Sequence, residues 1–132
     1  MKIAVISDIH GNIVYFNACL KEIEYLGCDM FVCLGDTVGY FPDALLCLEK
    51  LHALESHHLM GNHEAMMLGL APLSVEREHV YLLQSTRKLL PESEVHALKK
   101  LLPFWEITLD KHRLLFVHGS PWDPLQGYVY PD

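Results

Sequence analysis

A run of polar residues at positions 7–12 follows directly after the apolar segment Ile3–Ile6. The apolar segment is typical of a buried parallel strand, so the polar residues lie where that strand ends, on the edge at which open α/β sheets bind ligands. Asp8 and His10 stand two positions apart, and residues at this spacing in an extended segment point the same way. A carboxylate and an imidazole that converge on one point suit a divalent first-row metal ion. Taken alone, the pair fits equally well a capped turn beside an exposed histidine.

The order of the elements along the chain predicts an α/β fold. Apolar residues at helical spacing indicate a helix over 13–26 that ends at Gly27. A strand, a helix and a second strand in succession predict a right-handed parallel crossover. We expect strands at 2–6, 30–34 and 56–60, helices at 42–54, 74–90 and 91–102, and a hairpin of strands at 104–109 and 113–117 that turns at Asp110-Lys111.

Composition limits the classes of protein and partner. The 132 residues are 51% hydrophobic and 20% charged, which is typical of one globular domain. A net charge of −7 argues against a large nucleic-acid-binding face, so nucleic acid is expected only as a phosphodiester substrate. A small phosphorylated substrate stays compatible with this charge because bound metal ions supply positive charge. The four cysteines show no Cys-x-x-Cys spacing and no apolar stretch approaches ~20 residues, so we expect free thiols, no membrane contact and a cytoplasmic protein.

Polar side chains also follow three of the four later strands. Asp36 comes after the strand at 30–34, Asn62 and His63 come after the strand at 56–60, and His118 comes after the last strand. Each residue by itself fits a plain role, such as a turn former, but four clusters at four strand ends favour one shared site. Carboxylates, an amide and imidazoles together suit Mn, Fe, Zn, Ni or Co better than Ca or Mg. Two ions ~3.5–4 Å apart need a bridging carboxylate, and Asp36 lies between the other clusters.

These positions form four motifs that identify a family resemblance. They are Asp8-x-His10, Gly35-Asp36, Gly61-Asn62-His63-Glu64 and His118-Gly119. As a set they resemble the calcineurin-like metallophosphoesterases, and among them the small bacterial and archaeal phosphodiesterase-type branch. The resemblance runs from Met1 to the end of the chain. It implies the N-terminal half of an αββα sandwich, with a parallel βαβαβ unit followed by helices and a β-hairpin.

The resemblance also implies roles and an activity. Asp8 and His10 bind the first metal ion, Asp36 bridges both ions, Asn62 and His118 bind the second, and His63 contacts the phosphate to stabilise the transition state or protonate the leaving group. Family members hydrolyse phosphodiesters or phosphomonoesters with a metal-bridging hydroxide as the nucleophile. The expected cofactors are two divalent ions, manganese first, with iron, zinc, nickel or cobalt as alternatives, and no organic cofactor.

Three departures from the family pattern qualify this expectation. Glu64 replaces the usual Asp after Asn-His, which we expect to affect at most an outer partner of the site. Gly39-Tyr40 stands where the Ser/Thr protein phosphatase branch carries an Asp-Arg pair, so the phosphate-gripping arginine of that branch is missing. Residues 119–132 contain no histidine, whereas the family supplies one more histidine to each metal through a later Gly-His-x-His motif.

We therefore expect residues 1–132 to be a single, C-terminally truncated metallophosphoesterase domain. Two other functions stay open: a non-catalytic metal-binding or scaffold module with an incomplete centre, and a half-domain completed by another chain. Because each metal site would lack one imidazole, the sequence further predicts that residues 1–132 alone bind metal weakly and have little phosphodiesterase activity. It also predicts self-association, because apolar hairpin residues such as Trp105 and Leu115 would lie uncovered.

Overall fold

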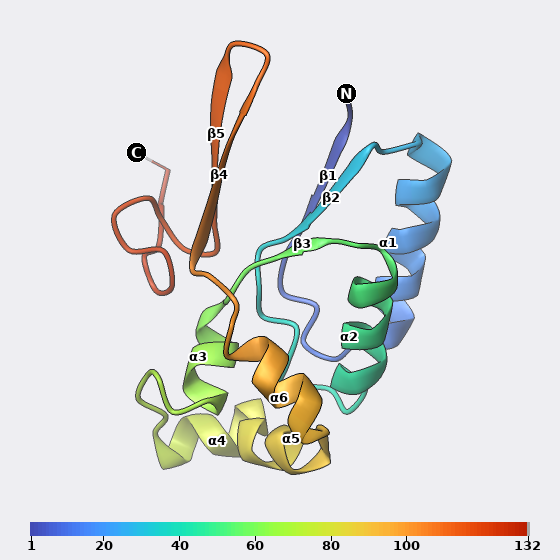
Figure 1. The fold of residues 1–132 in the computed structure, drawn as a ribbon. Helices are drawn as coiled ribbons and strands as arrows, with labels where there is room; N and C mark the ends of the chain where they lie inside the picture. The colour runs from blue at the N-terminus through green and yellow to red at the C-terminus, as the bar shows by residue number, and fades with distance from the viewer. Residues whose placement is uncertain (132) are drawn as a thin grey trace.

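The fold is built on a small parallel sheet. In the computed structural model, which describes residues 1–131, the strands lie in the order β1 (Ile3–Ile6), β2 (Met30–Cys33) and β3 (His57–His58) (Figure 1). β2 pairs in parallel with both neighbours, which confirms the predicted crossover. β3 is shorter than the predicted 56–60; the N–H of Leu59 still bonds to the carbonyl of Cys33, and the N–H of Met60 bonds to the carbonyl of Leu102.

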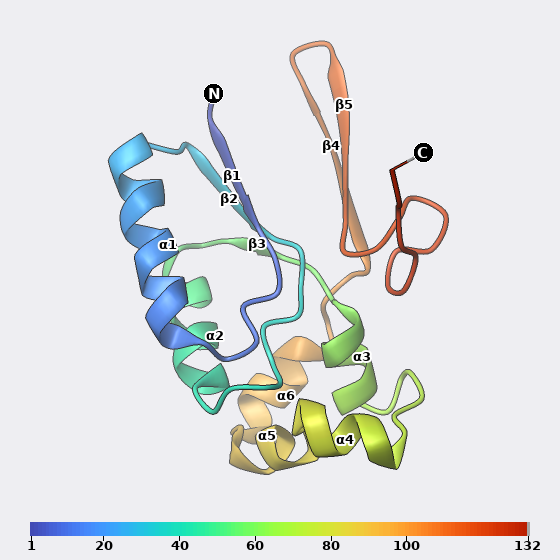
Figure 2. The same ribbon diagram turned by 180° about the vertical axis from the view of Figure 1, so that it is seen from behind.

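Two helices cover one face of this sheet (Figures 1 and 2). α1 (Ile13–Leu26) begins at Asn12, whose side chain accepts a hydrogen bond from the N–H of Tyr15, and it ends at the left-handed Gly27, as predicted. α2 (Ala44–Ala53) begins two residues later than expected, because the N–H groups of Phe41 and Asp43 bond to the turn at 10–11. The apolar faces of both helices pack on the sheet around a buried cluster: Ala4, Ile9, Phe16, Phe31, Cys33, Cys47 and Leu51.

The helices in the middle of the chain are shorter and more numerous than the sequence pattern predicts. α3 (Asn62–Met67) has six residues and was not predicted, because so short a segment shows no helical period. The single helix expected over 74–90 is two helices, α4 (Val75–Tyr81) and α5 (Leu83–Leu89), separated by Leu82 at φ 57°. α6 (Glu92–Leu98) ends before the predicted 102.

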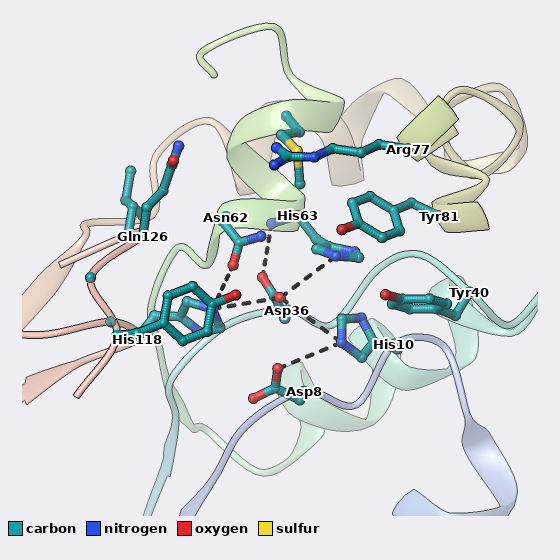
Figure 3. A pocket seen from close by; sticks show the side chains of 15 residues that line it. Asp8, His10, Asp36, Tyr40, Asn62, His63, Arg77, Tyr81, His118 and Gln126 are labelled. Carbon is teal, nitrogen blue, oxygen red and sulfur yellow. Dashed lines mark hydrogen bonds and ion pairs between the residues drawn. The ribbon is translucent and has the colours of Figure 1, made fainter. Parts of the chain in front are cut away.

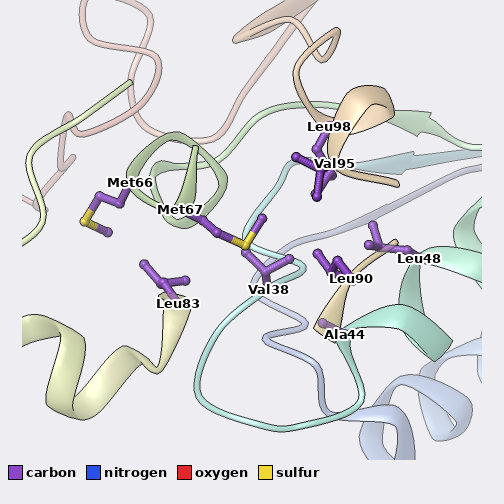
Figure 4. Close-up of a cluster of buried hydrophobic side chains, with 9 residues drawn as sticks. All are labelled: Val38, Ala44, Leu48, Met66, Met67, Leu83, Leu90, Val95 and Leu98. Atoms are coloured by element: carbon purple, nitrogen blue, oxygen red, sulfur yellow. The ribbon is translucent and has the colours of Figure 1, made fainter. Parts of the chain in front are cut away.

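These short helices enclose a second core. Its buried members come from α2, α3, α5, α6 and the loop after β2 (Figure 4): Val38, Ala44, Leu48, Met66, Met67, Leu83, Leu90, Val95 and Leu98. Because Met66 and Met67 lie one turn after Asn62 and His63 on α3, the same core that closes this end of the molecule also fixes the residues of the candidate site.

The hairpin forms a separate sheet. β4 (Phe104–Leu109) and β5 (His112–Val117) pair antiparallel and turn at 110–111, as predicted, and they stand to one side of the parallel sheet (Figures 1 and 2). The expectation that His118 lies at the edge of the parallel sheet is therefore wrong: it follows a strand of the second sheet. Trp105 is half-buried instead of uncovered, because its ring stacks on His57, with centroids 3.8 Å apart. Leu115 is exposed, as predicted.

Two further findings concern thiols and membranes. All four cysteines are free. Among the helices of residues 1–131, none combines the length and the apolar character needed to cross a bilayer.

Candidate metal centre

All six residues singled out by the sequence line one open cavity of about 390 Å³ (Figure 3). They arrive from the loops after β1 and β2, from the start of α3 and from the loop after β5: Asp8, His10, Asp36, Asn62, His63 and His118. Residues more than a hundred positions apart in the chain thus meet at one point. The structure brings together every residue that the sequence predicted for the site.

The pair Asp8 and His10 converges for a different reason than the one predicted. Both residues have left-handed backbones, with φ of 58° and 50°, so the segment is not extended. Their N–H groups bond to the carbonyls of Gly35 and Asp36, at 3.1 and 2.9 Å, and these bonds tie the first loop to the second. His10 Nε2 lies 3.6 Å from Asp8 Oδ1, and this contact is the main reason that the pKa of Asp8 is lowered to about 2. Left-handed non-glycine residues are uncommon and concentrate at functional sites.

Asp36 lies at the centre of the cavity. Its Oδ2 is 3.5 Å from His118 Nε2 and 3.9 Å from Nε2 of both His10 and His63, while its Oδ1 accepts a hydrogen bond from the N–H of His63 at 2.8 Å. Gly61 packs directly against the carboxylate, and a β-carbon there would overlap it. Burial first, and then the carboxylate of Glu64, raise the pKa of Asp36 to about 7. A bound cation would favour the ionised form of this buried carboxylate and so offset the cost of its burial.

One backbone carbonyl orients two of the imidazoles. The carbonyl of Val38 accepts from Nδ1 of His10 at 3.1 Å and from Nδ1 of His63 at 3.2 Å. A carbonyl only accepts, so both Nδ1 atoms carry hydrogen, and in a neutral ring the Nε2 atom then presents a lone pair to the cavity. Burial, followed by the nearby His10, lowers the pKa of His63 to about 4, so this ring is neutral near pH 7. Such an arrangement is the one that metal-binding histidines usually show.

The second sheet contributes His118 opposite these rings. Its Nε2 lies 2.8 Å from Oδ1 of Asn62, and its Nδ1 lies 3.5 Å from the hydroxyl of Ser7. Two predicted ligand atoms from separate parts of the fold are therefore hydrogen-bonded to each other, with the Asn62 oxygen as the acceptor. Ser7 is placed to accept the Nδ1 hydrogen of His118 when Nε2 takes a ligand role.

The donor atoms fall into two groups that share Asp36. In one, His10, Asp36 and His63 each offer an atom within 4.8 Å of the others, and in the second Asp8, Asp36 and His118 do so. Mixed oxygen and nitrogen donors of this kind fit divalent transition-metal ions. The carboxylate common to both groups is the one that the sequence assigned as the bridge.

Glu64 is the residue whose importance the sequence understated. It is fully buried, and its two oxygens accept four backbone hydrogen bonds, from Asp36, Thr37, Val38 and Gly61. The carboxylate thereby shapes the loop that carries Asp36. The only signal in the sequence was the departure from the usual Asp at this position.

The rim of the cavity was also missed. Tyr81 and Arg77 reach it from α4, and Tyr40 stacks on His63 with ring centroids 5.3 Å apart. Gln126 (Figure 3) and Tyr128, both from the chain after β5, also line the cavity. The segment after β5 shows no hydrophobic period, so the sequence did not place Gln126 or Tyr128. The prediction of one helix over 74–90 gave no sign that α4 turns toward the cavity.

A family model described as calcineurin-like phosphoesterase matches residues 1–132. The chain belongs to the calcineurin-like phosphoesterase family. This confirms the resemblance drawn from the four motifs and the α/β fold that it implied. Members of this family are phosphoester hydrolases that normally bind divalent metal ions, and the cavity around Asp36 is where the phosphoesterase motifs meet.

The relatives that the chain matches are longer than the chain itself. An uncharacterized protein of Methanocaldococcus jannaschii is 32% identical over 98% of the chain, which spans 54% of that protein. The crystal structure of a metallophosphoesterase from Sphaerobacter thermophilus is 30% identical, with a TM-score of 0.79 over 98% of the chain and 51% of that protein. A structure assigned provisionally as a diadenosine tetraphosphatase is 25% identical, with a TM-score of 0.62 over 77% of the chain and 43% of that protein. The chain thus spans about half the length of the relatives it matches.

Proposed function

We propose that this phosphoesterase hydrolyses phosphodiesters or phosphomonoesters of small molecules at a centre of two divalent ions, manganese first. The observation that carries the proposal is the position of Asp36. Its buried carboxylate is common to both groups of donor atoms and faces three imidazoles within 3.9 Å. A shared carboxylate of this kind is what a pair of ions needs.

The residues around Asp36 divide into two proposed ligand sets. Asp8, His10 and Asp36 hold one ion, and Asp36, Asn62 and His118 hold the other. Ions bound there lower the pKa of water and neutralise charge on the phosphoryl oxygens. The protein's part is to aim its donors: the Val38 carbonyl fixes His10, and Ser7 supports His118.

His63 has a separate proposed role at the substrate. Its lowered pKa leaves Nε2 unprotonated in the free protein. An incoming phosphate anion favours the protonated ring, which then donates a hydrogen bond to a phosphoryl oxygen or a proton to the leaving group. Tyr40 and Tyr81 both pack against this ring, with centroids 5.3 and 4.5 Å away, and they contact each other at 5.2 Å, so the three rings support one another.

Two other functions compete with this proposal. A metal-binding or scaffold module would retain the ions without turnover, and a half-domain would act only with a second chain. Metal-dependent turnover by the isolated chain is expected only of an enzyme, so its observation would argue against both alternatives.

The experiment starts from chain stripped of metal with a chelator. Mn²⁺ is added in steps, bound metal is measured by elemental analysis, and hydrolysis of bis-p-nitrophenyl phosphate and p-nitrophenyl phosphate is followed, with diadenosine tetraphosphate in the same panel. We expect a low turnover that rises until two ions are bound and that Asp36→Asn abolishes, while the exposed hairpin variant Asp110→Asn retains it. Two bound ions without turnover on any ester would support the scaffold function instead.

A further inference from the structure

Arg77 is a free cation at the mouth of the cavity. The chain has three arginines, and Arg87 and Arg113 pair with Glu92 and Glu106 at 2.8 and 3.0 Å. Within residues 1–131, Arg77 forms no such pair, and among the described residues that line the cavity it is the only lysine or arginine. A lone guanidinium beside a predicted phosphate site is a candidate ligand for phosphate, which it binds with two parallel hydrogen bonds.

The fold holds Arg77 in this place. A hydrogen bond joins its helix, α4, to the loop after β2 that carries Asp36. The N–H of Tyr40 donates to the carbonyl of Tyr81 at 2.8 Å. That carbonyl is available because the helix breaks at Leu82, so it has no helical partner of its own. Arg77 and Tyr81 are four residues apart and therefore share one face of α4, the face that lines the cavity.

The position of Arg77 differs from that of the proposed metal ligands. In Figure 3, His63 lies between Asp36 and Arg77, and the arginine extends along the rim on the α3 side. The cavity, at about 390 Å³, is in the size range of sites for whole small molecules. Its floor carries the carboxylates and imidazoles, and its rim carries the single guanidinium. One cavity would thus offer two separate positions for phosphate groups, one at the proposed metal ligands and one at the guanidinium of Arg77.

We propose that Arg77 binds a second phosphate group of the substrate, adjacent to the phosphate that is hydrolysed. The inference rests on the proposed function and narrows its substrate class to compounds with neighbouring phosphates, such as nucleoside diphosphates and longer polyphosphates.

Binding of two stable analogues tests the inference without turnover. Methylenediphosphonate has two neighbouring phosphonates and methylphosphonate has one, and the dissociation constant of each is measured by calorimetry at a fixed free Mn²⁺ concentration. We compare wild type, Arg77→Ala, Arg77→Lys and the control Arg87→Ala, after thermal unfolding shows that each variant is folded. The wild-type protein is expected to prefer the diphosphonate. Arg77→Ala should weaken the binding of methylenediphosphonate by roughly 10–100-fold, the usual effect of losing a charged hydrogen-bond pair. The same variant should change the binding of methylphosphonate by less than about threefold.

The other variant and the other possible results also test whether Arg77 binds a second phosphate. Arg77→Lys should recover part of the preference, because the charge stays but the fork is lost. Equal loss for both analogues would place Arg77 on the hydrolysed phosphate and overturn the inference, as would no preference in wild type or no effect of Arg77→Ala. Loss of the preference in a protein that hydrolyses no ester would keep the inference and refute the proposed hydrolase.

Discussion

Oε2 of Glu64 accepts a hydrogen bond from the N–H of Asp36 at 2.8 Å, so one buried carboxylate holds the backbone of another. The same side chain accepts from the N–H groups of Thr37, Val38 and Gly61. Its charge also contributes to the raised pKa of Asp36. Glu64 therefore shapes the loop at the centre of the site and, through charge, makes that site more receptive to cations.

Replacing Glu64 should damage both stability and metal binding. Glu64→Ala leaves four buried N–H groups without an acceptor, at about 1–3 kcal/mol each, so we expect a loss of at least about 4 kcal/mol in the free energy of unfolding. Glu64→Gln turns an amide N–H₂ toward two of these donors and should also destabilise. Urea unfolding measures the loss, with the exposed Glu22→Gln on α1 as the control. Wild-type stability in Glu64→Ala would show that the four hydrogen bonds do not hold the loop.

Asp36→Asn should have opposite effects on stability and metal binding. The folded pKa of Asp36, about 7, lies above the ordinary 3.8, so the folded state holds this proton more tightly. The stability linked to Asp36 is therefore fully present below about pH 4 and is lost as the pH rises through 7. Without metal, Asp36→Asn should be more stable than wild type at pH 8, by roughly 1–4 kcal/mol, with a smaller difference at pH 5.

The stability and metal content of this variant are measured together. Urea unfolding is carried out at both pH values in the presence of a chelator, and bound Mn²⁺ is measured by elemental analysis after reloading. We expect metal to fall at both sites, because one shared anion is lost, and the exposed Asp110→Asn to behave as wild type. Undiminished metal in Asp36→Asn would refute the bridging role.

The sequence predicted the site better than it predicted the path of the chain. The ligand candidates follow strands, and apolar strands followed by polar residues are visible without tertiary information. The reason given for the first pair was nevertheless wrong, since Asp8 and His10 converge through left-handed backbones that the second loop supports. The break at Leu82 carries no glycine or proline, and it accompanies a tertiary hydrogen bond from the N–H of Tyr40 to the carbonyl of Tyr81 that no local pattern reveals. Arg77 could not be assigned to the cavity before that break was known.

His63→Ala separates a chemical role from a ligand role. If His63 acts on the substrate, turnover should fall by roughly 10²–10⁴-fold, the range for a positioned proton donor, while bound Mn²⁺ stays at the wild-type level. The exposed His96→Ala on α6 should leave both unchanged. His63 also belongs to one of the two donor groups, so loss of metal together with activity would move it into the ligand set.

The hairpin predicts association between chains. Leu115 and Phe104 are 44% and 50% exposed on β5 and β4, next to strand edges without partners in the described residues. Exposed apolar strand surfaces favour self-association. Light scattering over a concentration series should show a mass above that of the monomer, and Leu115→Lys should lower it. A monomer at all concentrations would contradict this expectation.

The central claim is that Asp36 joins two metal ions, and anomalous scattering from crystals grown with Mn²⁺ tests it most directly. We predict two anomalous peaks about 3.5–4 Å apart. Both should contact Asp36, one beside Asp8 and His10 and the other beside Asn62 and His118. A single peak, or two peaks of which one does not contact Asp36, would contradict the shared centre on which the proposed hydrolysis depends.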